Sequence, residues 1–321
     1  MERINIEHII DEVVKCVEKH ELFTGGYSRY GEDTINEYGC ADAANILYTI
    51  NRFPKEPAVR AEWVKTLQSM QDPETGLYSE PTHFPMHTTA HCVAALELFD
   101  ALPVHPIYAY EKYTKVENLY SLLEEEVDWK VNPWRYSHMG AGIYVCLVLT
   151  DMVDAQWRDG YFEWMWEHSH EEMGFFVHGD PTAELYMYMA GGFHYMFNHE
   201  YDHRAYRYPE KIIDSCLELI ENCKHLFVSC GFIDVDVVYA LNRAMRQTPY
   251  RFYEAKAALE KYAIKYIAML DALDFETDKY FNDLHMLFGT VCCLAELQIA
   301  LPGKIMTEKP LRLVLDRRPF I

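Results

Sequence analysis

The side chains best suited to chemistry in this chain are carboxylates and imidazoles that stand a few residues apart. Asp234 and Asp236 open one apolar segment and His285 opens another, while His87 and His91 are spaced by four and would share one face of a helix. Such groups act as general acids and bases or as metal ligands. The candidate catalytic residues are therefore Asp234, Asp236, His285, His87, His91 and Glu184.

A second group of polar residues lies at or near the expected starts of other apolar helices. Side chains in a first helical turn, together with free backbone N–H groups, can point into a shared pocket. We take these residues as candidate substrate-binding groups: Asp42, Tyr38, Arg135, Tyr136, His138 and Tyr188. A single carboxylate at a helix start is more often a cap, so the prediction rests on their clustering. Such a pocket suits a hydroxylated or charged small molecule.

The elements that must position these residues are helices arranged in a repeat. Turns containing Gly or Asp followed by an aromatic residue, such as "DPETGLY" at 72–78 and "DFETDKYF" at 274–281, recur about every 50 residues. Amphipathic segments precede the turns, as at 57–70 and 254–273. Segments that are apolar nearly all round follow them, as at 92–99, 143–153, 185–197 and 288–297. In these turns we expect the Asp to cap, the Gly to adopt an unusual backbone angle, and Tyr78 or Tyr280 to pack beneath.

Six such units predict an all-α fold, an (α/α)6 toroid in which the apolar helices form an inner barrel and the amphipathic helices an outer wall. Residues 1–302 would form this single domain, and 303–321 a basic C-terminal tail packed on it. An open solenoid of helical repeats is the alternative architecture.

The stretch "LQSMQDPETGLYSE" resembles the repeat of the terpenoid cyclase and protein prenyltransferase superfamily, which implies an (α/α)6 toroid with a central cavity. The segments "GFIDVDVVYALNRAM" and "NDLHMLFGTVCCLAEL" resemble the zinc-binding repeats of protein prenyltransferase β subunits. That resemblance implies a site for zinc or another divalent metal at Asp234, Asp236 and His285, with Asp236 in place of the family's Cys. "IDVD" also resembles the acidic motif of class II terpene cyclases, which implies a proton donor at Asp236.

Composition limits the remaining function classes. The formal net charge of −21 opposes nucleic acid binding, and no apolar run is long enough for a membrane span. Nine cysteines without a CxxC pattern predict reduced thiols and, with the absence of a signal peptide, a cytoplasmic protein. No partner subunit is evident. We expect an enzyme acting on a small-molecule ligand by acid/base or metal-assisted chemistry, and a carbohydrate-active hydrolase, lyase or epimerase, or a non-catalytic binding module, are the alternatives.

Overall fold

Segments that are apolar nearly all round form six long helices at the centre of the molecule. The computed structural model describes residues 1–321. Most of the chain is helical and every strand is only two or three residues long, which confirms the all-α prediction. The six inner helices are α2 (Glu37–Thr49), α4 (Pro85–Glu97), α6 (Pro133–Val148), α8 (Leu185–Tyr201), α10 (Ile233–Ala244) and α12 (Leu284–Ala300). Because most of their residues are buried, these helices must be covered on all sides.

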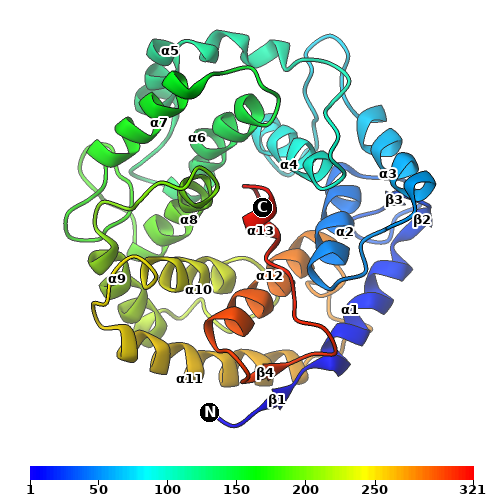
Figure 1. Ribbon diagram of the computed structural model, residues 1–321, viewed down its shortest axis with the longest axis vertical. Helices are drawn as coiled ribbons and strands as arrows, with labels where there is room; N and C mark the ends of the chain where they lie inside the picture. The colour runs from blue at the N-terminus through cyan, green and yellow to red at the C-terminus, as the bar shows by residue number, and fades with distance from the viewer.

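The inner helices pack side by side in sequence order. Each of them contacts the next, from α2 against α4 through α10 against α12, and α12 in turn packs against α2 (Figure 1). All six carry candidate residues from the sequence at or near their N-terminal turns. The packing brings residues distant in sequence to a common centre.

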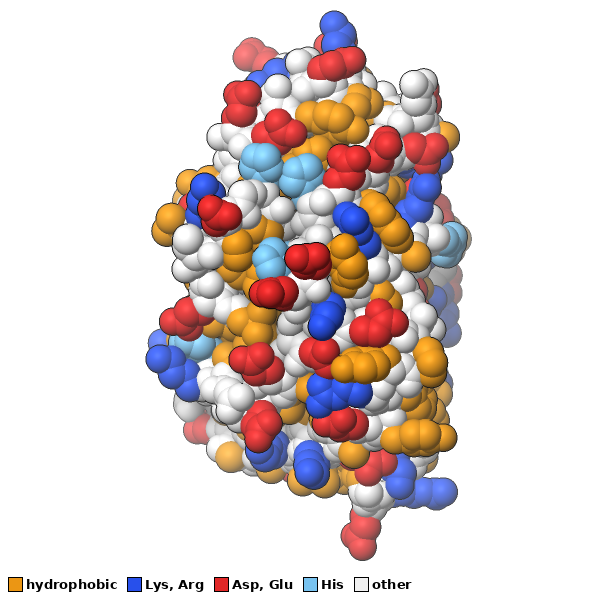
Figure 2. All heavy atoms as spheres, turned by 90° about the vertical axis from the view of Figure 1, so that its left-hand side faces the viewer, with side chains coloured by type: hydrophobic (Ala, Val, Ile, Leu, Met, Phe, Trp, Pro, Cys, Tyr) orange, Lys and Arg blue, Asp and Glu red, His pale blue; other side chains and the backbone are white.

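The amphipathic segments form an outer layer around these helices (Figure 1). Its members are α1 (Glu7–Lys19), α3 (Pro57–Ser69), α7 (Ala155–Glu167), α9 (Pro209–Asn222) and α11 (Phe252–Asp271), with the short elements η1 (Tyr108–Thr114), α5 (Val116–Ser121) and η2 (Leu122–Glu126) in the third position. Thus α3 and α11 confirm the amphipathic helices expected at 57–70 and 254–273 to within two residues. Acidic and basic side chains are interspersed over the face of the molecule that Figure 2 shows.

The turn at 72–78 serves a structural purpose. The Asp72 carboxylate accepts hydrogen bonds from the backbone N–H groups of Glu74 and Thr75, at 2.8 and 2.9 Å. Gly76 has φ +76°, and a Cβ atom there would lie 2.0 Å from the carbonyl oxygen of Pro106. Tyr78 is fully buried, as expected. The corresponding expectation for Tyr280 is wrong: it is 39% exposed, and the next residue, Phe281, packs beneath the turn instead.

Residues 303–321 run from the outer layer to the centre. Their strand β4 (Ile305–Met306) pairs in parallel with β1 (Ile4–Asn5), whereas β2 (Glu21–Phe23) and β3 (Gly26–Tyr27) form a separate hairpin. In the short helix α13 (Val314–Arg317), Arg317 pairs with Glu97 at 2.5 Å and with Asp100 at 2.7 Å. Phe320 and Ile321 are buried among the inner helices (Figure 1).

Two further sequence features can be compared with the structure. All nine cysteines are free thiols, and eight of them are buried. None of the helices combines the length and the apolar character that a membrane crossing requires.

Candidate functional site

A cavity of about 440 Å³ lies where several inner helices begin. Its lining comes from α4, α6, α8, α10 and α12, from the loops before α4, α10 and α12, and from the C-terminal residue Ile321. Six of the lining residues are histidines: His83, His87, His138, His194, His225 and His285. The chain contains 15 histidines in all, so a large share of them converges on this one space.

The charge of this lining differs from that of the whole chain. Although the sequence has 50 Asp and Glu residues, none of them lines the cavity, whereas Arg135 does. The other polar groups are uncharged, and include Thr82, Asn132 and Ser229. A cavity with imidazole and guanidinium groups and no Asp or Glu side chain in its lining favours an anionic ligand.

Asp42 of α2 lies behind the cavity wall and bonds two histidines. Its Oδ1 lies 2.8 Å from Nε2 of His91, and its Oδ2 lies 3.1 Å from Nδ1 of His285. All three residues are at most 2% exposed. Burial raises the pKa of Asp42, but the two imidazoles outweigh burial and hold that pKa below its ordinary value. Asp42 therefore stays ionised and fixes His285 with its Nε2 left free.

Three other imidazoles that line the cavity have their Nδ1 atoms bonded to a protein oxygen. Nδ1 of His87 lies 2.5 Å from the hydroxyl of Tyr38, and Nδ1 of His194 lies 2.8 Å from Oγ of Ser137. Nδ1 of His83 lies 2.7 Å from Oγ1 of Thr82. In each case Nε2 is the nitrogen left for a ligand. His138 has no hydrogen bond to the protein through either nitrogen.

Burial keeps these imidazoles uncharged at neutral pH. It lowers the pKa of His83 and of His194 to about 3, and that of His285 to about 4 despite the opposing effect of Asp42. For His87 and His138, burial and the neighbouring imidazoles lower the pKa well below its ordinary value. Neutral imidazoles offer lone pairs, so they can accept a proton or bind a metal.

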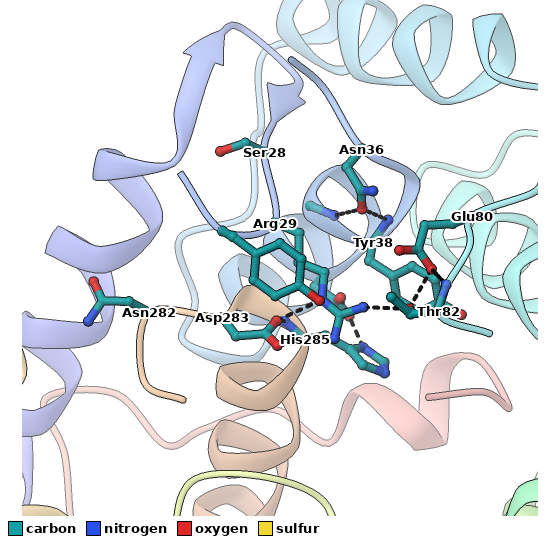
Figure 3. A network of polar contacts seen from close by, with 12 residues as sticks. Ser28, Arg29, Asn36, Tyr38, Glu80, Thr82, Asn282, Asp283 and His285 are labelled. Atoms are coloured by element: carbon teal, nitrogen blue, oxygen red, sulfur yellow. Dashed lines mark hydrogen bonds and ion pairs between the residues drawn. The ribbon is translucent and has the colours of Figure 1, made fainter. Parts of the chain in front are cut away.

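A buried ion pair positions the first turn of α12 (Figure 3). Arg29 forms a bidentate pair with Asp283, at 2.8 Å for Nε to Oδ1 and 3.0 Å for Nη2 to Oδ2, and its Nη1 donates to Oγ1 of Thr82 at 3.0 Å. Asp283 is also the N-cap of α12, because its Oδ1 accepts the backbone N–H of His285. The pair thus connects the His285 turn to the loop that carries His83.

The structure brings one part of the predicted site together. His87, His138, His285 and Arg135 line the cavity. Tyr38, Asp42 and His91 lie behind it: Tyr38 bonds His87, Asp42 bonds His285, and His91 stacks on His87.

Asp234 and Asp236 lie apart from this group. One oxygen of Asp234 accepts a hydrogen bond from the hydroxyl of Tyr262 on the outer helix α11, and one from the backbone N–H of Phe227 at 3.2 Å. Asp236 is fully buried, neither of its oxygens has a partner, and it does not line the cavity. The donor atoms that lie close enough to share a metal ion, within 4.8 Å of one another, belong instead to Asp42, His91 and His285.

Three more sequence candidates also lie away from the cavity lining. Glu184 lines a separate surface pocket between α8 and α9. Tyr136 packs against Phe84, with ring centroids 5.4 Å apart. The hydroxyl of Tyr188 accepts the backbone N–H of Thr182 at 2.9 Å and so fixes the loop before α8.

Sequence reasoning also missed residues that belong to the site. His83 precedes Pro85, the first residue of α4, and so lies outside that helix, yet it lines the cavity. His194 lies within the apolar stretch "GGFHYMF", which reads as core. Arg29 lies in the loop "GGYSRY", and no motif marks it. Of these three residues, only His194 could have been found from the sequence, because it is a histidine within an otherwise apolar inner helix.

No protein-family profile, curated protein sequence or solved structure matches this chain. The function must therefore be inferred from the residues and their geometry.

Proposed function

We propose that this protein is an enzyme of the (α/α)6 toroid class that acts on a small anionic molecule in the His-lined cavity. The cyclic packing of the inner helices, in which α12 contacts α2, supports the toroid, as does the alternation of inner and outer helices along the chain. The resemblance of the turn "LQSMQDPETGLYSE" to the terpenoid cyclase and prenyltransferase repeat points the same way. Fold alone would not select a reaction.

The observation that carries the proposed activity is the bond between Asp42 and His285. A carboxylate that accepts Nδ1–H of an imidazole fixes its tautomer and leaves Nε2 as a base. Burial lowers the pKa of His285 to about 4, so its Nε2 is unprotonated at neutral pH, and an anionic substrate beside it would raise that pKa and strengthen it as a base. Asp42 would then stabilise the imidazolium that forms.

The rest of the lining suits recognition of an anionic group. Arg135 is exposed at the rim of the cavity and stacks over Phe84, with its guanidinium carbon 4.7 Å from the ring centroid. Asn132, Thr82 and Ser229 add uncharged polar groups. Glycoside hydrolysis by two carboxylates is less well supported, because that mechanism places both acids beside the scissile bond and neither an Asp nor a Glu lines the cavity.

The experiment is a comparison of matched anionic and neutral ligands on wild-type protein, His285→Gln and Arg135→Ala. Sugar phosphates, dicarboxylates and isoprenyl diphosphates are each paired with the parent alcohol, sugar or ester. Thermal shift measures binding and mass spectrometry measures products. We expect anionic members to bind, Arg135→Ala to weaken their binding, and His285→Gln to abolish turnover while binding persists. Preference for the neutral partners, or turnover that is unchanged in His285→Gln, would refute the proposal.

A further inference from the structure

The hydrogen bonds around the cavity imidazoles decide which of their nitrogens carries a hydrogen. A neutral imidazole has one N–H group, so one nitrogen donates and the other accepts. Nδ1 of His285 lies 3.1 Å from Oδ2 of Asp42, and an ionised carboxylate can only accept. The hydrogen of His285 is therefore on Nδ1, and its Nε2 has the lone pair.

The same reasoning places the hydrogen of His83 and of His194 on Nδ1. The hydroxyl of Thr82 donates its only hydrogen to Oε2 of Glu80 at 2.5 Å (Figure 3), so it accepts from Nδ1 of His83 at 2.7 Å. The hydroxyl of Ser137 donates to a backbone carbonyl three residues earlier at 2.5 Å, so it accepts from Nδ1 of His194 at 2.8 Å. Both histidines thus also keep their lone pair on Nε2.

His87 has the opposite arrangement. Its Nδ1 lies 2.5 Å from the hydroxyl of Tyr38, whose other contact, with Oγ1 of Thr88, is much longer at 3.4 Å. The phenolic hydrogen is therefore donated to Nδ1 of His87, which leaves the imidazole hydrogen on Nε2. Among these four cavity imidazoles, His87 alone offers an N–H donor through Nε2.

His87 and His285 lie close enough to act on one small molecule. Their ring centroids are 6.2 Å apart, with 89° between the ring planes. Tyr38 packs against both rings, with its ring centroid 5.8 Å from that of His87 and 4.5 Å from that of His285. A catalytic base and a hydrogen-bond donor each act over about 3 Å, so two neighbouring atoms of a ligand can contact both imidazoles.

We propose that the His-lined cavity enolises an anionic carbonyl compound: Nε2 of His285 removes a proton from the carbon next to the carbonyl group, and Nε2–H of His87 donates a hydrogen bond to the carbonyl oxygen. This inference rests on the proposed function, to which it adds a second catalytic residue and the substrate class. Tyr38 is a positioning residue, because it acts through the tautomer of His87. Arg135 at the rim binds the anionic group of the substrate.

The step conserves every atom and electron. The C–H bond breaks, its proton moves to Nε2 of His285, and its electron pair forms a C=C bond while the carbonyl π pair moves onto the oxygen. His87 holds the resulting oxyanion, and Asp42 stabilises the imidazolium of His285. Return of the proton to that carbon restores the substrate, and exchange of the imidazolium proton with solvent before its return replaces the C–H hydrogen by one from water. No oxidant, reductant or second substrate is required.

The first test reads the tautomers in the ligand-free protein. Histidine labelled with ¹⁵N is followed by long-range ¹H–¹⁵N correlation NMR at neutral pH, and the signals of His87 and His285 are assigned by their loss in His87→Leu and His285→Gln. We expect the hydrogen of His87 on Nε2 and that of His285 on Nδ1. Tyr38→Phe should shift His87 toward the Nδ1–H tautomer. Tyr120→Phe, which loses a hydrogen bond to the Gly160 carbonyl in the outer layer, is the matched control and should shift neither histidine.

The second test measures exchange of carbon-bound hydrogen in D₂O by proton NMR. The probes are pyruvate and dihydroxyacetone phosphate, and lactate and glycerol phosphate are the matched ligands without a carbonyl group. We expect wild-type protein to exchange the hydrogens next to the carbonyl group faster than the protein-free reaction does, and to leave the matched ligands unchanged. His285→Gln should abolish this exchange. His87→Leu should lower kcat for exchange by about 10²- to 10³-fold with little change in KM, as removal of an oxyanion donor does, whereas His87→Gln keeps an N–H donor and should retain more of the rate.

The remaining outcomes also decide the inference. A hydrogen on Nδ1 of His87, or exchange that His87→Leu leaves unchanged, overturns it, and so does absence of exchange with both carbonyl probes. If anionic ligands are converted in a reaction that depends on His285 but exchanges no C–H hydrogen, the proposed function stands and this inference fails. Circular dichroism confirms that each variant is folded. Should His87→Leu not fold, Tyr38→Phe takes its place: slower exchange supports the inference, and unchanged exchange refutes it.

Discussion

Arg29 and Asp283, which lie 254 residues apart in sequence, form a bidentate ion pair with N–O distances of 2.8 and 3.0 Å. The side chains are only 4% and 11% exposed. The pair connects the loop before α2 to the start of α12, and so joins the first and last helix pairs of the chain beside His285. Because of this position, both the stability of the fold and the geometry of the site depend on the Arg29–Asp283 ion pair.

Replacement of Arg29 should therefore be strongly destabilising. Arg29→Ala leaves Asp283 buried without its cation, which typically costs about 3–5 kcal/mol. Urea denaturation followed by circular dichroism measures the loss. Arg158→Ala is the matched control, because Arg158 is 36% exposed and its partner Asp202 keeps a second arginine, Arg204. That variant should lose no more than about 1 kcal/mol. Equal effects of the two variants would contradict this role for Arg29.

Asp42→Asn should reduce turnover while the fold is retained. The amide cannot accept from both imidazoles and stabilise a charge on His285 as the carboxylate does. Loss of such a general base system lowers kcat by about 10²- to 10⁴-fold. The measurement is kcat and KM on the anionic substrate that the ligand comparison identifies. Asp214→Asn, on the outer helix α9, is a carboxylate control that should leave kcat unchanged. A change confined to KM would argue against a role for Asp42 in the chemical step.

Asp234 should make stability depend on pH. Burial raises its pKa from 3.8 to about 6, although Tyr262 and the Phe227 N–H partly oppose this effect. The folded chain thus holds the proton more tightly than the unfolded chain, so stability falls as pH rises from about 4 to 6 and remains reduced above that range. Asp234→Asn removes the charge, and we expect a gain of up to about 3 kcal/mol at pH 8 and a smaller gain at pH 5.

Urea denaturation at the two pH values measures that gain. Asp33→Asn serves as the control, since Asp33 is exposed and its replacement should have little effect at either pH. If Asp234→Asn instead abolished catalysis with no gain in stability, Asp234 would belong to the reaction after all.

The turn glycine Gly76 should not tolerate a side chain. Gly76→Ala places a Cβ 2.0 Å from the Pro106 carbonyl at a positive φ of +76°. We expect a loss of about 2–4 kcal/mol, the sum of backbone strain and overpacking. Gly31→Ala separates the two effects, because Gly31 has φ +87° with open space around it. That variant should lose only about 1 kcal/mol, from backbone strain alone. Thermal unfolding compares the two, and similar losses would show that the contact with Pro106 is unimportant.

The sequence by itself determined which segments are helical and which of them are buried. Hydrophobic periodicity is a local property, so it located α3 and α11 to within two residues and distinguished the apolar inner helices from the amphipathic outer ones. The turn at Asp72 was likewise readable, because its carboxylate bonds backbone groups only two and three residues away.

Only the tertiary structure decided which polar residues meet. Residues two apart on a helix point about 200° apart, so Asp234 and Asp236 cannot both face the position of His285, however close they are in sequence. His87 and His91 share a face, but a helical turn places His91 deeper, where Asp42 holds it. The convergence of His83, His138 and His194 depends on how three separate segments pack. Local sequence patterns do not encode such long-range packing.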